Sequence, residues 1–194
     1  MRVLDAAFGH PRGMAGRLGG RLMVRGNAEQ ERWAADRAGL APGQRVLEVG
    51  HGPGIGLALA AVAVGPGGRV TGVDPSATMR EMAAGRLARE IADGVVEVRD
   101  GSAERTGCAD ASVDAVISVN NVMMWDRPAG FAELFRVLRP GGLLVLTVHR
   151  HVLGVPAERL RADAEAAGFD PVELSSRLRR FNSPAIELLA HRPA

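Results

Sequence analysis

The sequence predicts an α/β fold in which helices cover both faces of a single, mostly parallel sheet. Short apolar runs alternate with stretches of helical periodicity along almost the whole chain of 194 residues, and this alternation is typical of parallel sheets. The apolar run at 143–148 is nearly continuous, as a strand covered on both faces requires. No linker-like composition marks a second domain. We therefore expect residues 1–194 to form one domain around one core.

Within this domain, residues 1–43 differ from the core predicted at 44–194. The first 26 residues contain six glycines interspersed with arginines, and a glycine inside a helix costs roughly 1 kcal/mol. We expect a partly helical arm that either closes over a bound ligand as a lid or forms a dimer contact. Asn27 is followed three residues later by Gln30, which is typical of a helix start, so a capping helix is predicted at 28–38.

The other elements follow from the apolar runs and the residues that flank them. Ser76 and Pro128 suit the beginning of a helix, and Gly168 suits the position after a helix end. Strands are predicted at 45–49, 69–73, 95–99, 112–119, 143–148, 172–178 and 185–190. Helices are predicted between them at 57–64, 77–91, 128–138 and 156–167. The last two strands are expected to form a hairpin-like pair.

The most informative stretch is R-V-L-E-V-G-H-G-P-G-I-G at 45–56. An apolar strand that carries one acid, Glu48, ends in alternating glycines, and a helix follows. Glycines permit positive φ and the close approach of a ligand, and the helix start presents free N–H groups. The dinucleotide fingerprint G-x-G-x-x-G does not fit, because its third glycine would fall on Ile55 or Leu57. The phosphate loop G-x-x-x-x-G-K-[ST] is excluded, since the chain has no lysine.

An acid two residues before G-x-G-x-G resembles motif I of the class I S-adenosylmethionine (SAM)-dependent methyltransferases. The resemblance covers about residues 44–150, including L-R-P-G-G at 138–142. It implies a Rossmann-like, doubly wound sheet of seven strands in the order 3-2-1-4-5-7-6, with strand 7 antiparallel. It also implies SAM as cofactor, S-adenosylhomocysteine as product, and an in-line displacement at the methyl group. A cofactor with an ammonium and a sulfonium but no phosphate gains from a nearby carboxylate rather than from lysine.

Successive strand ends supply the residues that match this family's cofactor site. Asp74, which follows the second strand, matches the position that accepts the ribose hydroxyls, and Asp100, after the third, matches the adenine-binding position. Asn120, after the fourth strand, is expected to meet the methionine end. His51 is expected to shape the glycine loop rather than to do chemistry. The cofactor-binding residues that the resemblance implies are Glu48, Gly50, His51, Gly52, Gly54, Asp74, Pro75, Asp100, Gly101, Ser102, Ala103 and Asn120.

The methyl acceptor is expected to lie near the strand at 143–148. His149 directly follows this strand and is the leading candidate for a general base, although a base is needed only if the nucleophile must lose a proton. A structural role for this histidine is the alternative. The two methionines after the fourth strand either line an apolar pocket or pack in the core. The expected substrate pocket comprises His10, Met123, Met124, Trp125 and His149. No metal site is expected, because H-E-x-x-H and paired cysteines are absent.

Composition limits the partners and the location. The 24 basic and 22 acidic residues nearly balance, aromatic residues make up 4%, and N-P-P-[YF] does not follow the fourth strand; these features favour a small-molecule substrate over nucleic acid. The single cysteine excludes an internal disulfide, and no apolar run is long enough to span a membrane. We therefore expect a cytoplasmic transferase, as a monomer or a homodimer, without nucleic-acid or membrane partners. Two alternatives stay open: a nucleic-acid or protein methyltransferase guided by the arginine-rich arm, and a protein that binds SAM without transferring its methyl group.

Overall fold

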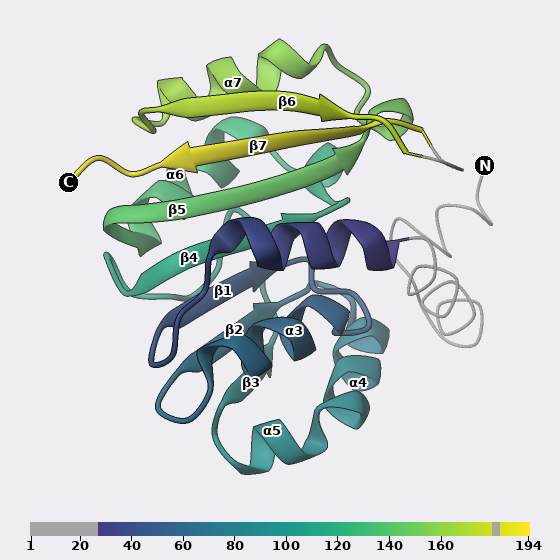
Figure 1. The fold of residues 1–194 in the computed structure, drawn as a ribbon, viewed down its shortest axis with the longest axis vertical. Coiled ribbons are helices and arrows are strands. Elements are labelled where there is room, and N and C mark those ends of the chain that lie inside the picture. Colours follow the sequence, from purple (N-terminus) through teal and green to yellow (C-terminus); the bar gives the residue numbers. More distant parts are fainter. Residues whose placement is uncertain (1–26, 180–182) are drawn as a thin grey trace.

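A seven-stranded sheet with the strand order β3-β2-β1-β4-β5-β7-β6 forms the centre of the molecule (Figure 1). The computed structural model describes residues 27–179 and 183–194; the arm at 1–26 lies outside them. The first five strands pair in parallel, and β7 is antiparallel to both β5 and β6. The predicted strand order and the antiparallel closing pair are thereby confirmed. The strands are β1 (Arg45–Val49), β2 (Arg69–Val73), β3 (Val96–Arg99), β4 (Val113–Val119), β5 (Leu138–His149), β6 (Val172–Arg177) and β7 (Ala185–His191).

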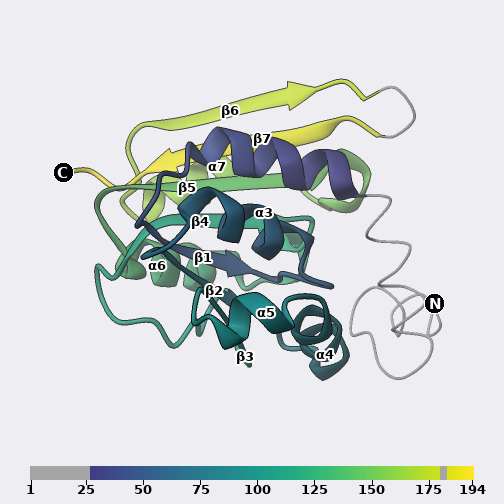
Figure 2. The ribbon, with the colours of Figure 1, turned by 60° about the horizontal axis from the view of Figure 1, so that its bottom comes forward.

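Helices cover both faces of this sheet (Figures 1 and 2). One hydrophobic cluster joins the strands to Phe131 and Leu160 on one face, and a second cluster joins them to Ala34, Leu57 and Ala83 on the other. The doubly wound arrangement predicted from the alternation of elements is confirmed. The helices are one at 27–38, α3 (Ile55–Val64), α4 (Ala77–Arg86), α5 (Ala88–Ala92), α6 (Arg127–Val137) and α7 (Ala157–Ala166), with short 3₁₀ turns η2 (Val122–Met124) and η3 (Arg150–Val152).

Two elements differ clearly from their predictions, whereas the boundaries of the others lie within two residues of those predicted. The helix predicted at 77–91 is broken at Leu87, whose φ of −110° and ψ of 25° leave the helical region while its side chain stays buried in the core. Gly85, a weak helix former, lies just before this break. β5 is longer than predicted, because Leu138 already pairs with β4 and the residues R-P-G-G that follow it bulge out of the ladder. Sequence periodicity does not report either feature, since both depend on packing against distant strands.

Glu29 links the helix at 27–38 to β6, the strand at one edge of the sheet, and to the residues that follow it. Glu29 accepts hydrogen bonds from Arg177 Nη1 at 2.5 Å and from Arg179 Nε at 2.9 Å, and the Arg177 guanidinium lies 5.9 Å from the Trp33 ring centre. Asn27 is already helical, so the helix starts at least one residue before the predicted 28. Within the part of the chain that the structure describes, no helix combines the length and the apolar character needed to cross a membrane.

Candidate cofactor and active site

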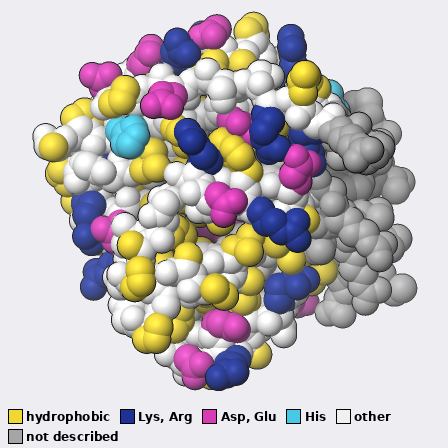
Figure 3. All heavy atoms as spheres, viewed as in Figure 1, with side chains coloured by type: hydrophobic (Ala, Val, Ile, Leu, Met, Phe, Trp, Pro, Cys, Tyr) yellow, Lys and Arg dark blue, Asp and Glu magenta, His cyan; other side chains and the backbone are white. Residues whose placement is uncertain are grey.

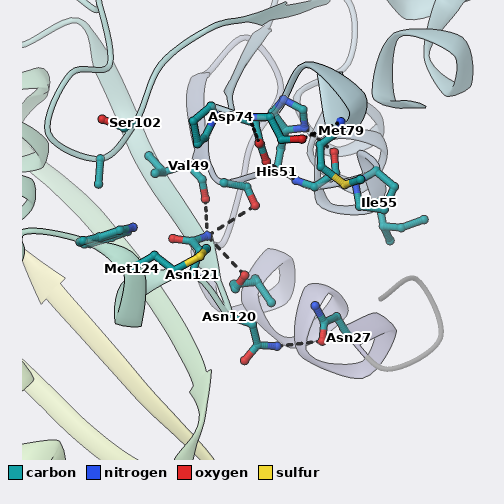
Figure 4. Close-up of a pocket in the computed structure, with 18 of the residues that line it drawn as sticks. Asn27, Val49, His51, Ile55, Asp74, Met79, Ser102, Asn120, Asn121 and Met124 are labelled. Carbon is teal, nitrogen blue, oxygen red and sulfur yellow. Dashed lines mark hydrogen bonds between the residues drawn. The ribbon is translucent and has the colours of Figure 1, made fainter. Parts of the chain in front are cut away.

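A cavity of about 570 Å³ opens beyond the carboxyl ends of β1, β2 and β4 (Figure 4). This is the point where the strand order reverses, and open α/β sheets bind their ligands at such points. Among the described residues that line the cavity there are three acids and no arginine. The lining residues are Asn27, Glu31, Val49, Gly50, His51, Gly52, Pro53, Ile55, Asp74, Pro75, Ser76, Ala77, Thr78, Met79, Ser102, Ala103, Glu104, Val119, Asn120, Asn121, Met124 and Trp125.

The glycine loop presents bare backbone to this cavity. Gly52 has a φ of 52°, and a Cβ added there would meet no atom within 4 Å, so a ligand can approach its backbone closely. Gly50 also lines the cavity. Gly54 packs instead against Ala83 of α4, where an added Cβ would lie 3.0 Å from the alanine Cβ. The loop therefore has the predicted form of a glycine turn between a strand and a helix, with Gly50 and Gly52 facing the cavity, whereas Gly54, also predicted to bind the cofactor, does not line it.

Asp74 lies at the tip of β2 and holds the glycine loop in place. Its Oδ2 accepts from the Gly52 N–H at 3.0 Å, and its Oδ1 accepts from the Ser76 N–H at 2.8 Å. Burial raises the pKa of this carboxyl, although His51 and both backbone N–H groups act in the opposite direction. Each carboxylate oxygen keeps a further lone pair. Asp74 is thus placed beside the cavity with the acceptor capacity that the ribose prediction requires.

His51 is buried in the glycine loop and also lines the cavity. Its Nδ1 lies 2.8 Å from the carbonyl oxygen of Gly52, and a carbonyl only accepts, so Nδ1 carries the proton. Burial lowers the pKa of His51. Its Nε2 is then an unprotonated acceptor, and it is buried without a partner among the described residues. This histidine shapes the loop and leaves one acceptor available to a ligand.

The four residues at 100–103 that were predicted to bind the cofactor do not all lie at the cavity. Ser102 and Ala103 line it. The Asp100 side chain is 60% exposed and forms ion pairs with Arg80 at 2.8 Å and Arg105 at 3.9 Å. Gly101 packs against Val73 and, like Asp100, is absent from the cavity wall. The turn after β3 therefore meets the cavity through its second half, and a role for Asp100 stays a prediction.

Asn120 and Asn121, after β4, have separate tasks (Figure 4). Asn121 is buried, and its Nδ2 donates to the carbonyl oxygen of Val49 at 2.7 Å, which ties the end of β4 to the end of β1. Asn120 adopts a positive φ of 56°. Its Nδ2 donates to Asn27 Oδ1 and Gln30 Oε1, each at 2.9 Å. Asn120 thus lines the cavity where it was predicted, with a side chain that binds the helix at 27–38.

His149 lies at the end of β5 but does not line the cavity. Its Nδ1 is 3.0 Å from Nη1 of Arg179; a guanidinium only donates, so Nδ1 must be the unprotonated nitrogen. Burial, followed by the charges of Arg179 and His151, lowers the pKa of His149 to about 4. The ring is therefore neutral at pH 7, with its one acceptor already engaged. A structural role, the alternative weighed from the sequence, fits this geometry better than a general base does.

The other residues predicted for the substrate pocket are divided. Met124 and Trp125 line the cavity, whereas Met123 packs against the hydrophobic core. His10 lies outside the described residues. Among those residues, no group of three or more histidine, cysteine or acidic side chains is arranged to hold a metal ion.

Several residues that line the cavity were not predicted as site residues, and one of them, Glu31, is a buried acid. Glu31, on the helix at 27–38, lines the cavity although it is only 8% exposed. It approaches Glu48 of β1: a Cβ added to Gly56 would lie 2.3 Å from Glu48 Oε1 and 2.7 Å from Glu31 Oε2. The only sequence signal is weak, namely that Glu31 falls three residues before the buried Ala34 and so shares its helix face. Glu48 itself lies behind the loop and does not line the cavity.

Comparisons with known proteins point to one family. A family model described as a methyltransferase domain matches residues 47–146, just over half of the chain. The chain is 28% identical over 165 residues to the uncharacterized methyltransferase YdaC of Bacillus subtilis, covering 81% of the chain and 88% of that protein. It is 40% identical over 112 residues to the arsenite methyltransferase of Halobacterium salinarum, covering 57% of the chain but only 28% of that protein.

A solved structure shows the same fold. Phosphoethanolamine N-methyltransferase 2 of Haemonchus contortus, in complex with SAM, superposes with a TM-score of 0.74 at 21% identity, over 86% of the chain and 53% of that protein. The chain thus spans most of YdaC but about a half or less of the other two relatives. With the motif, the strand order and the family match in agreement, the chain belongs to the class I SAM-dependent methyltransferases.

Proposed function

We propose that this protein transfers the methyl group of SAM to a small molecule. The observation that supports this most directly is the charge of the cavity. Glu31, Asp74 and Glu104 line it, and no arginine does so among the described residues. A cavity of this kind favours a ligand that carries positive charge and no phosphate, which is the chemistry of SAM. Its volume of about 570 Å³ lies within the usual range for small-molecule sites.

Each part of the cavity offers groups that fit one part of this cofactor. The bare backbone at Gly52 would lie against the methionyl chain, and Asp74 would accept from the ribose hydroxyls. Ser102 and Ala103 would border the adenine ring. The apolar side chains that line the wall, Ile55, Val119, Met124 and Trp125, would restrict the access of water to the reacting methyl group. SAM supplies the activated methyl group, so the protein mainly has to align the acceptor with it and keep water away.

The protein itself provides positioning rather than proton transfer. His149, the candidate base, is turned towards Arg179, and its lowered pKa leaves it a poor proton acceptor at neutral pH. An acceptor that is already nucleophilic when it binds, such as a neutral amine, an ionised thiol or a trivalent metalloid, requires no base. Two relatives are named for small acceptors, arsenite and phosphoethanolamine, which supports a small-molecule acceptor; of the two, trivalent arsenic already has a free lone pair and requires no base.

A nucleic-acid substrate has less support. Acidic and arginine side chains are mixed on the face that Figure 3 shows, and the described residues form no continuous basic surface on that face. Electrostatic binding of a phosphate backbone depends on such a surface. The third possibility, cofactor binding without transfer, makes the same prediction for affinity and differs only in turnover.

The test has a binding part and a turnover part. Calorimetric titration with SAM and with S-adenosylhomocysteine should show saturable one-to-one binding to the purified full chain. Incubation with SAM and a panel of arsenite, amines, thiols and phenols, followed by mass spectrometry, should then reveal a product heavier by one methylene. Binding with no product across the panel would support a protein that does not transfer the methyl group. Methylation of RNA or protein alone would contradict the small-molecule proposal.

A further inference from the structure

The buried carboxyl groups of Glu31 and Glu48 form a pair without a basic neighbour among the described residues. Glu31 is 8% and Glu48 is 2% exposed, and in each of them Oε2 is buried without a hydrogen-bond partner. Both approach the same point above Gly56. Such groups are costly to bury in ionised form. The pair is therefore stable only when a carboxyl group is protonated or a cation binds next to it.

The groups around the pair do not supply that cation. α3, which packs next to it, contains no charged residue. Asp74, at the tip of β2, adds a further negative charge that acts on Glu48. His51, in the glycine loop, is buried, and burial lowers its pKa and so disfavours its charged form. On the same helix, Gln30 is neutral and Glu29 is engaged with Arg177 and Arg179. The open side of the pair is the cavity, which Glu31 lines.

We propose that Glu31 binds the ammonium group of the cofactor's methionyl end, with Glu48 behind it as a positioning residue, and that cofactor binding displaces a proton from this pair. The inference rests on the proposed use of SAM and adds a residue that lies outside the glycine motif. Glu31 comes from the helix at 27–38 and reaches the cavity directly, whereas Glu48 acts through Glu31. Specificity for the amino-acid part of the cofactor then depends on this helix.

The proton balance follows from the environment of the pair. Burial raises the pKa of Glu31 to about 8, and burial together with the charges of Glu31 and Asp74 raises the pKa of Glu48. At pH 7 the empty pair therefore holds at least one proton. An ammonium placed against Glu31 favours the ionised carboxylate, so the proton leaves for solvent as the cation enters. Below pH 8, affinity should fall with decreasing pH by at most about tenfold per pH unit, the limit for one linked proton.

The first measurement counts protons. S-Adenosylhomocysteine is titrated into the full chain at pH 7 in phosphate and in Tris, whose ionisation enthalpies differ, and the difference in heat gives the number of protons released. Wild type should release more than Glu31→Gln, by up to about one proton. The ligand's own amino group contributes equally to both titrations, so the difference isolates the glutamate pair. Glu165→Gln, the same change at an exposed site on α7, should behave as wild type.

The second measurement compares two ligands. S-Adenosylhomocysteine carries the ammonium, and 5′-methylthioadenosine lacks the whole amino-acid part. Glu31→Gln should weaken binding of the first by roughly 10- to 100-fold, the usual effect of losing a charged hydrogen bond. Binding of the second should change by less than about threefold, because it does not reach Glu31. Glu48→Gln, from the strand, should also lower the proton count while changing affinity less.

The outcomes separate this inference from the proposal on which it rests. Equal proton release and an unchanged ratio of the two affinities in Glu31→Gln would overturn the role of Glu31 while leaving SAM binding intact. If wild type binds neither ligand, the use of SAM is refuted and the inference with it. Should Glu31→Gln fail to fold, the same two measurements on Glu48→Gln decide, since loss of the proton release supports the pair and its persistence overturns it.

Discussion

Replacement of Asp74 tests whether its carboxylate binds the cofactor in addition to holding the glycine loop in place. Asp74→Ala removes the acceptor of the Gly52 and Ser76 N–H groups, which lie at 3.0 and 2.8 Å. Hydrogen bonds to a charged group contribute about 1.5–3 kcal/mol each, but burial raises the pKa of this carboxyl, so part of that gain offsets its desolvation. We expect a net loss of stability of about 1–3 kcal/mol for Asp74→Ala, and less than about 1 kcal/mol for Asp74→Asn, which keeps one acceptor.

In free energy, the effect on cofactor affinity should be of about the same size as the effect on stability. Loss of a charged acceptor for the ribose hydroxyls corresponds to roughly a 10- to 150-fold weaker affinity. Calorimetry with S-adenosylhomocysteine measures this affinity, and thermal unfolding of the same samples measures stability. Asp93→Asn, an exposed acid at the opposite edge of the sheet, should alter neither. If Asp74→Ala unfolds more easily yet binds S-adenosylhomocysteine within twofold of wild type, the carboxylate only supports the loop and the ribose assignment is wrong.

Three further predictions concern packing and titration. Gly56→Ala places a Cβ 2.3 Å from Glu48 Oε1 and 2.7 Å from Glu31 Oε2 and should lower thermal stability by about 1–3 kcal/mol; Gly85→Ala, in open space on α4, should raise it by roughly 0.5–1 kcal/mol. His149→Asn keeps an acceptor for the neighbouring arginine, so the dependence of kcat on pH between 6 and 9 should match wild type. If the variant instead loses the fall in kcat towards low pH, His149 acts as the general base. Folded Glu31 binds protons up to a pKa of about 8 instead of 4.5, so the stability of the empty protein should fall as pH rises through that window. Glu31→Gln should flatten this fall in denaturant titrations, and an unaltered slope would contradict the buried acid.

Local sequence was sufficient for the strands and for part of the cavity wall. The alternation of apolar runs and the glycine loop are properties of neighbouring residues, and parallel topology then brings Asp74 and Asn120 to one edge without further information. The pattern did not reveal Glu31, because its burial depends on contact between the helix at 27–38 and Gly56 of α3. The state of His149 was equally hidden: Arg179, thirty residues further along the chain, determines which ring nitrogen carries the proton.

The position of Glu31 is fixed before any ligand arrives, and this can be checked by hydrogen exchange. Next to it, the fully buried Gln30 donates to Thr147 Oγ1 at 3.0 Å and accepts from Asn120 Nδ2 at 2.9 Å. Displacing the helix would leave these buried groups unpaired, at about 1–3 kcal/mol each. We therefore expect the amides of 30–38 to be strongly protected in the empty protein, with little gain on adding S-adenosylhomocysteine. Rapid exchange that slows only with ligand would mean that this helix folds onto the sheet as a closing segment, and the ammonium site would then form on binding rather than precede it.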